Sequence, residues 1–205
     1  MSASARDEVL ALMRELETQP VHVAHVTDLA LQLFDSLAPL HGLGEAERFL
    51  LEAAGYLHDI GHQYDYLGLG HHKQSARIIR EHAWNNLSPA QVSVIALVAC
   101  YHRKSMPELK HEHFAALPDS DRKIVQKLAA LLRLADSLDR SHEGCVSRVS
   151  AELLPKQIVF HLETTGPVWR EVITAHAKGD LAQAVFQRDL VFKAGGEVIK
   201  PERPL

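Results

Sequence analysis

Six polar side chains interrupt apolar segments or lie at their ends, and all six belong to residue types that bind divalent metal ions. The pair His58-Asp59 follows an apolar stretch that ends at Leu57. Neutral imidazole and ionised carboxylate are ligands for Zn²⁺, Mn²⁺, Fe²⁺ and Co²⁺, and metal ligation offsets the free-energy cost of burying both groups. The other candidates are spread along the chain: His22, His71 or His72, His102 and Asp136.

Each candidate falls on a different expected helix or on a loop beside one, so a helical bundle can bring them to one centre. Four histidines and two aspartates can hold two cations. Asp59 is the expected bridge, because a carboxylate has two oxygens whereas a neutral imidazole has one free lone pair. Two adjacent metal ions activate water and stabilise a leaving oxygen. The pattern therefore predicts a metal-dependent phosphohydrolase with Asp59 as a catalytic residue.

Basic residues follow the candidate ligands directly: Lys73 comes after the histidine pair, and Arg103 after His102. Cations near the metal site would hold phosphate oxygens, so both are predicted as catalytic residues, the alternative being solvated charges at helix ends. Arg140 is expected to orient Asp136. Two positions are open for Asp139, on an outer helix face or behind a ligand that it orients. His25 is expected behind the ligands, and the surface is expected to hold His41, His62, His82, His111 and His113.

The composition is ordinary for a globular protein with a sizeable core: 205 residues, 46% hydrophobic and 23% charged. The formal net charge of −4 argues against nucleic acid as a partner. No apolar run reaches the roughly 20 residues that a membrane span needs. Cys100 and Cys145 lack the spacing of a disulfide scaffold or metal site. We expect a cytoplasmic protein without a membrane anchor.

Apolar periodicity predicts a helical body up to about residue 144, with a small α+β part after it. Alternating segments around Pro155 predict a β-hairpin, followed by helical segments and one more strand. The polar segment 103–121 is expected to be a loop with one short helical turn. The expected long helices cover residues 5–17, 20–40, 45–59, 73–85, 89–102 and 122–142.

The ordered pattern of histidines and aspartates resembles the HD-domain superfamily of metal-dependent phosphohydrolases. Four segments are similar to the C-terminal HD domain of the exopolyphosphatase/guanosine pentaphosphate phosphatase (Ppx/GppA) family: AAGYLHDIGH, HHKQSARII, YHRKSMPEL and LAALLRLADSLDRSH. VHVAHVTDLALQLFD and the strand-rich tail fit it too, so the resemblance covers nearly the whole chain. It implies a mostly α fold, an HD-type helical bundle over residues 1–144 with a small α+β extension over residues 145–205.

The resemblance also implies roles for the candidate ligands. The primary metal ligands would be His22, His58, Asp59 and Asp136. His71 and His102 correspond to the additional histidines of members with two metals, with His72 as the neighbouring candidate. The expected cofactors are one or two divalent ions per chain, of Mn, Fe, Co, Zn or Mg.

The family's phosphoanhydride chemistry belongs to an N-terminal actin-like domain with glycine-rich phosphate loops. This sequence contains no GxGxxG or P-loop motif, so polyphosphatase activity is not expected to carry over and the HD site is expected to stand alone. The leading expectation is hydrolysis of a nucleotide or other phosphoester or polyphosphate. Two alternatives remain: a non-catalytic regulator that binds such a ligand, and a di-iron oxygenase, since these ligands suit several metals. A homodimer is expected, because symmetric dimers are the commonest oligomers.

Overall fold

The computed structural model describes residues 4–65, 70–103 and 105–200. Helices make up the N-terminal part: α1 (Ala5–Leu16), α2 (Pro20–Ser36), α3 (Ala38–His41), α4 (Glu45–Leu57), the 3₁₀ helix η1 (His62–Tyr64), α5 (His71–Glu81), α6 (Pro89–Cys100), α7 (Glu112–Ala115) and α8 (Asp119–Leu138). The C-terminal part contains β1 (Val146–Leu153), β2 (Gln157–Thr164), α9 (Trp169–Lys178), α10 (Asp180–Phe186), β3 (Asp189–Ala194) and β4 (Glu197–Val198). The predicted class, mostly α with a small C-terminal α+β part, is confirmed.

Two helices differ from the predicted bounds in ways that matter for the site. The predicted helix 20–40 breaks at Leu37, because Pro39 lacks the N–H group that a continuous helix requires. Helix α5 begins at His71 instead of residue 73, so the histidine pair lies in its first turn. Gly70 precedes it with φ 96°, a conformation that glycine adopts without strain. Residues 66–69 of the predicted loop lie outside the described residues.

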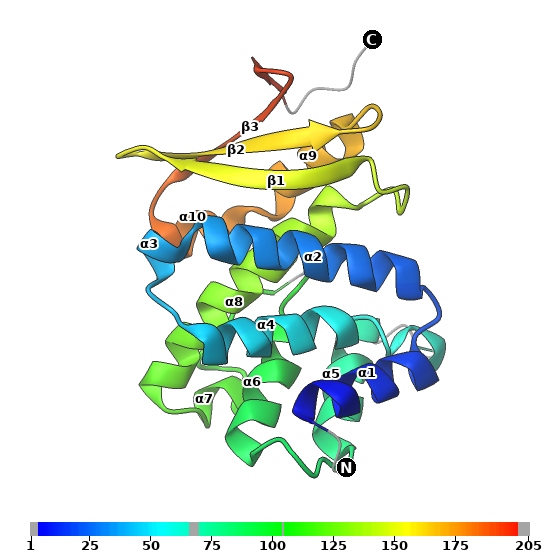
Figure 1. Ribbon diagram of the computed structural model, residues 1–205. Coiled ribbons are helices and arrows are strands. Elements are labelled where there is room, and N and C mark those ends of the chain that lie inside the picture. Colours follow the sequence, from blue (N-terminus) through cyan, green and yellow to red (C-terminus); the bar gives the residue numbers. More distant parts are fainter. Residues whose placement is uncertain (1–3, 66–69, 104, 201–205) are drawn as a thin grey trace.

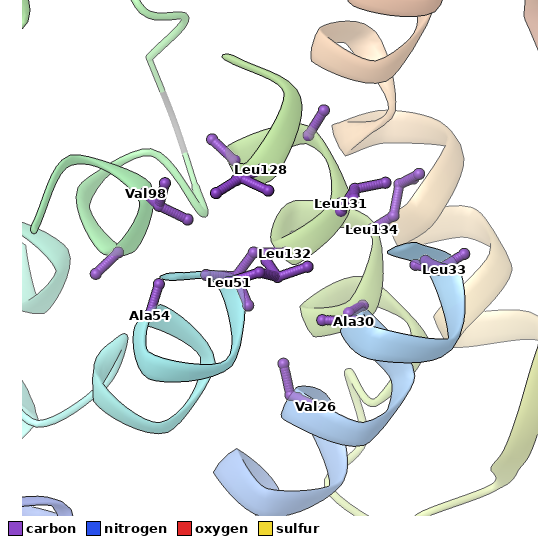
Figure 2. Close-up of a cluster of buried hydrophobic side chains, with 14 of the residues drawn as sticks. Val26, Ala30, Leu33, Leu51, Ala54, Val98, Leu128, Leu131, Leu132 and Leu134 are labelled. Carbon is purple, nitrogen blue, oxygen red and sulfur yellow. The ribbon is translucent and has the colours of Figure 1, made fainter. Parts of the chain in front are cut away.

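Helices α2, α4, α6 and α8 pack around a common core (Figure 1). Close approach of α2 and α4 depends on Gly55, because a Cβ there would lie 2.6 Å from Thr27 Oγ1. Helix α8 contacts the other three helices and also α9 and α10, so its C-terminal end can meet residues from both parts of the chain. Buried side chains from the four helices form the cluster in Figure 2: Val26, Ala30, Leu33, Leu51, Ala54, Val98, Leu128, Leu131, Leu132 and Leu134.

The sheet lies at the end of the molecule opposite α5 and α7 (Figure 1) and has the strand order β1-β2-β3-β4. The predicted hairpin is present, with β1 and β2 antiparallel. β2 and β3 are parallel, so α9 and α10 form the crossover between them. Phe160 and Phe192 stack across these strands, with ring centroids 5.1 Å apart. The buried cluster continues from the helices to the sheet.

The sequence also predicted a division of the chain into two parts and the absence of a membrane span. The division into parts 1–144 and 145–205 follows the change in secondary structure and stays a prediction. None of the helices within the described ranges combines the length and the apolar character needed to span a bilayer.

Candidate metal centre

The His58-Asp59 pair lies in the turn between α4 and η1, and its carboxylate is surrounded by imidazole rings. The donor atoms of His22, His58 and Asp59 lie within 4.8 Å of one another, and so do those of Asp59, His71 and His102. All five side chains are buried. Asp59 therefore belongs to two groups of donors, as a bridging carboxylate would.

The two carboxylate oxygens of Asp59 face different groups. Oδ1 lies 3.2 Å from His71 Nε2 and 3.6 Å from His102 Nε2. Oδ2 lies 3.6 Å from His58 Nε2. The group at Oδ1 comes from α5 and from the turn after α6, whereas His58 belongs to the same turn as Asp59.

Asp136, near the end of α8, adds a carboxylate to the first group. Its Oδ1 lies 3.8 Å from His22 Nε2 and 4.0 Å from His58 Nε2. Its Oδ2 instead contacts Lys178 Nζ at 2.7 Å. The two oxygens of Asp136 are thus divided between the candidate metal position and a cation.

Local hydrogen bonds determine which ring nitrogens are available as ligands. His58 Nδ1 lies 2.7 Å from the carbonyl oxygen of Gly55, and His102 Nδ1 lies 2.7 Å from that of Ala99. A carbonyl oxygen only accepts hydrogen bonds, so each Nδ1 carries the hydrogen and donates it. In the neutral form of each ring the lone pair is therefore on Nε2, which faces Asp59. Both carbonyls belong to the last turn of a helix, where they lack helical partners.

His22 is held in the same way by Asp139, whose position the sequence left open. Asp139 is buried; its Oδ2 accepts from His22 Nδ1 at 2.7 Å, and its Oδ1 accepts from the Gly144 N–H at 3.0 Å. Burial lowers the pKa of His22, but the hydrogen bond to Asp139 and the charge of Asp136 outweigh it, so the pKa is raised. The three-residue spacing of Asp136 and Asp139 was the available signal, because it places both on one helix face.

Buried atoms in this centre lack hydrogen-bond partners within the described part of the chain: His22 Nε2, His58 Nε2 and Asp59 Oδ1. Burial raises the pKa of Asp59, but the nearby histidines, His58 first among them, bring it well below its usual range, so Asp59 is ionised. Burial lowers the pKa of His102 to about 3, so this ring is neutral. The lone pair of the neutral His102 Nε2 and the negative charge of Asp59 Oδ1 lie 3.6 Å apart and repel each other. A divalent cation would remove that repulsion, and the donor set fits one.

Lys178, at the end of α9, was missed by the sequence analysis, which assigned the orientation of Asp136 to Arg140. Burial raises the pKa of Asp136, but Lys178 and His102 lower it to about 2. Arg140 lines the same cavity but is exposed. No local pattern indicates Lys178, because it lies 42 positions from Asp136 and reaches it only through the packing of α9 on α8.

The donors open into a cavity of about 200 Å³. His62 is exposed, as expected, and lines this cavity with Nε2 3.5 Å from Asp59 Oδ2; this hydrogen bond raises its pKa. Arg103 Nη1 lies 3.2 Å from His71 Nε2. Besides these residues the cavity is lined by Gln19, His102, Asp136, Arg140, His142 and Lys178. The cavity therefore combines candidate ligands with cations.

Other predicted residues lie elsewhere. Lys73 is exposed and lines a neighbouring cavity with His72, whose ring centroid is 6.0 Å from that of His71, outside both groups of donors. His41, expected on the surface, is buried, with Nε2 2.7 Å from the Phe34 carbonyl oxygen. His25 is half-buried and lines a third cavity beside His22.

The comparison with known families agrees with the predicted relationship. Residues 6–177 match the family described as Ppx/GppA phosphatase, domain III. The chain therefore belongs to this phosphatase family. The part of the family that it represents is domain III. No curated protein matches the chain.

Proposed function

We propose that this protein is a metal-dependent phosphohydrolase of the HD type that acts on a nucleotide or another phosphoester or polyphosphate. The observation that carries the proposal is the position of Asp59, whose two oxygens each face a different group of buried histidine nitrogens. Membership of the Ppx/GppA phosphatase family supports a phosphorylated ligand.

The ligands divide into two sets that share one carboxylate. His22, His58, Asp59 and Asp136 would hold one ion, and Asp59, His71 and His102 would hold the other. A pair of divalent cations, when bound, supplies Lewis acidity and lowers the pKa of coordinated water towards neutrality.

The chain's own residues prepare the site for this chemistry. Hydrogen bonds from the Nδ1 atoms of His22, His58 and His102 keep the Nε2 lone pairs directed at the centre. Arg103 and Lys178 line the cavity and are positioned to bind phosphoryl oxygens. Negative charge that develops on phosphoryl oxygen during hydrolysis would be stabilised by these cations without further reorganisation.

A second candidate is a non-catalytic module that binds a phosphorylated ligand. The ion pair between Lys178 and Asp136 favours it, because a cation already neutralises one of the candidate ligands. Such a module would use the same cavity and the same cations, but it would release its ligand without hydrolysing it.

The test combines metal content with turnover in three proteins. Wild type, purified without chelator or nickel affinity, should contain about two divalent ions per chain and hydrolyse p-nitrophenyl phosphate or a nucleotide. Asp59→Asn should lose both properties. Asp28→Asn is the matched control, because Asp28 is exposed and accepts a hydrogen bond only from Gln32 on the same helix among the described contacts.

Three outcomes decide between the candidates. Undiminished hydrolysis by pure Asp59→Asn would refute the proposed mechanism. Absence of metal after reconstitution with Mn²⁺, Zn²⁺, Co²⁺ and Fe²⁺ would refute the metal centre. Binding of a nucleotide without turnover by metal-loaded wild type would favour the binding module.

A further inference from the structure

A second cavity, of about 300 Å³, adjoins the metal centre and shares Arg103 with it. It lies over α5 and the end of α6, and its lining includes the side chains of Lys73 and Arg80 from α5. Three cationic side chains therefore line it, against one carboxylate, Glu112, among the described residues of the lining.

The three cations have no carboxylate partners. Within the described residues, neither Lys73, Arg80 nor Arg103 forms an ion pair with an aspartate or glutamate. Arg77 on the same helix behaves differently: it is exposed and lies 3.6 Å from Glu81 Oε2. Three cations without a carboxylate partner among the described residues therefore gather at this one cavity.

Of the three cations, Arg80 would gain most from a bound anion. Its side chain is half-buried beside the apolar residues Ala76 and Leu97 of the lining, and burial lowers its pKa. A partly desolvated guanidinium without a partner is unfavourable, whereas a phosphate group matches its donor geometry in two parallel hydrogen bonds.

Two further features of the cavity suit an anion. Helix α5 begins at its edge, with His72 and Lys73 in the first turn, so the positive end of the helix dipole adds to the side-chain charges. The lining also includes His111, whose Nδ1 accepts from the Glu108 N–H at 3.4 Å and lies 2.8 Å from Tyr101 Oη, so its Nε2 carries a hydrogen that it can donate.

We propose that this cavity is a second phosphate subsite, which binds a phosphate group of the ligand other than the one at the metal centre. Arg103 connects the two positions, because it lines both cavities. The inference rests on the proposed function, because it assumes that the ligand of the subsite is the substrate of the phosphohydrolase. That substrate would then carry at least two phosphate groups. The binding site itself can be tested without metal.

The test is calorimetric titration of the metal-free full chain with inorganic pyrophosphate and with inorganic phosphate. Wild type should bind pyrophosphate, and raising the salt concentration should weaken binding. Arg80→Met, which keeps an unbranched apolar side chain but removes the guanidinium, and Lys73→Met, at an exposed position, should each weaken binding by about 10- to 100-fold. Arg77→Met, which removes a cation from the same helix outside the cavity, should bind like wild type.

The outcomes separate this inference from the proposed function. Equal pyrophosphate affinity in all four proteins, or none in wild type, would overturn the subsite whatever the metal content. Binding that depends on Arg80 and Lys73 supports the subsite even if no hydrolysis occurs. In the metal-loaded protein, Arg80→Met should raise KM more for a nucleoside triphosphate than for p-nitrophenyl phosphate. Equal changes in the two KM values would show that the subsite does not bind a phosphate group of the substrate. Its ligand would then be free phosphate.

Discussion

Gly61 is a position where one methyl group should separate the two halves of the candidate metal centre. Its φ of −82° is open to any residue. What the position requires is close approach. A Cβ at Gly61 would lie 2.4 Å from the His71 carbonyl oxygen and 2.4 Å from the Ser75 nitrogen, both backbone atoms of α5. Gly61 also donates its N–H to Ser75 Oγ at 2.9 Å.

Gly61→Ala should therefore move α5 away from the His58-Asp59 turn. Relief of the overlap requires a displacement of about 1 Å. That would lengthen the 3.2 Å separation of Asp59 Oδ1 from His71 Nε2. His22 and His58 lie on other elements and keep their positions. The expected result is loss of the second metal ion and retention of the first, with hydrolysis reduced by about 100-fold.

The stability of the variant can be predicted from the same contacts. Overpacking of this kind costs about 1–3 kcal/mol of unfolding free energy. For a protein of this size each kcal/mol lowers Tm by about 2–4 °C, so the expected decrease is about 2–12 °C. Calorimetric titration and elemental analysis measure the metal stoichiometry, and scanning calorimetry the stability.

Gly166→Ala is the control, because a Cβ there meets only Cys145 Sγ, at an ordinary 3.6 Å. It should bind metal like wild type. If Gly61→Ala bound both ions with wild-type affinity, close approach of α5 to the turn would not be what forms the second half of the centre.

Two other predictions concern the carboxylates at the end of α8. Asp139→Asn should weaken metal binding by about 10- to 100-fold in calorimetric titration. The amide can present an N–H to His22 Nδ1, which would reverse the tautomer that Asp139 selects. A metal affinity equal to that of Asp28→Asn would contradict this role. In metal-free protein the pKa of Asp136 falls from 3.8 to about 2, so the charged form contributes about 2 kcal/mol to folding above pH 4, and this is lost as pH falls through 2. Acid unfolding followed by circular dichroism should therefore be less steep between pH 4 and 2 in Asp136→Asn, and an unchanged slope would refute the contribution.

The sequence could single out the candidate donors because they interrupt a strong apolar pattern. His58, Asp59 and Asp136 stand at the ends of helices whose other residues follow an apolar period, so chemistry was the simplest explanation for them. The sequence could also indicate the helical body and the β-hairpin, since both depend on local periodicity. It could not show that the donors converge within 4.8 Å, because that depends on helix packing.

The residues that were missed depend on contacts between distant segments. Asp139 was ambiguous between two helix faces until α2 was placed against α8. Nothing in the sequence around His41 indicates that the Phe34 carbonyl oxygen accepts a hydrogen bond from this ring. The start of α5 depends on the backbone conformation of Gly70, and two residues of difference moved the histidine pair from a loop onto a helix.

The distance along the chain between Asp136 and Lys178 has a consequence for the order in which the centre is completed during synthesis. Every candidate metal ligand precedes Lys178, which is made 42 residues after Asp136. At translation rates of about 5–20 residues per second, that interval lasts about 2–8 seconds. During that interval both oxygens of Asp136 are free of this lysine, so a metal ion bound on the ribosome would meet a carboxylate that is not yet paired. Loading on the ribosome and loading of purified protein are therefore expected to differ in rate.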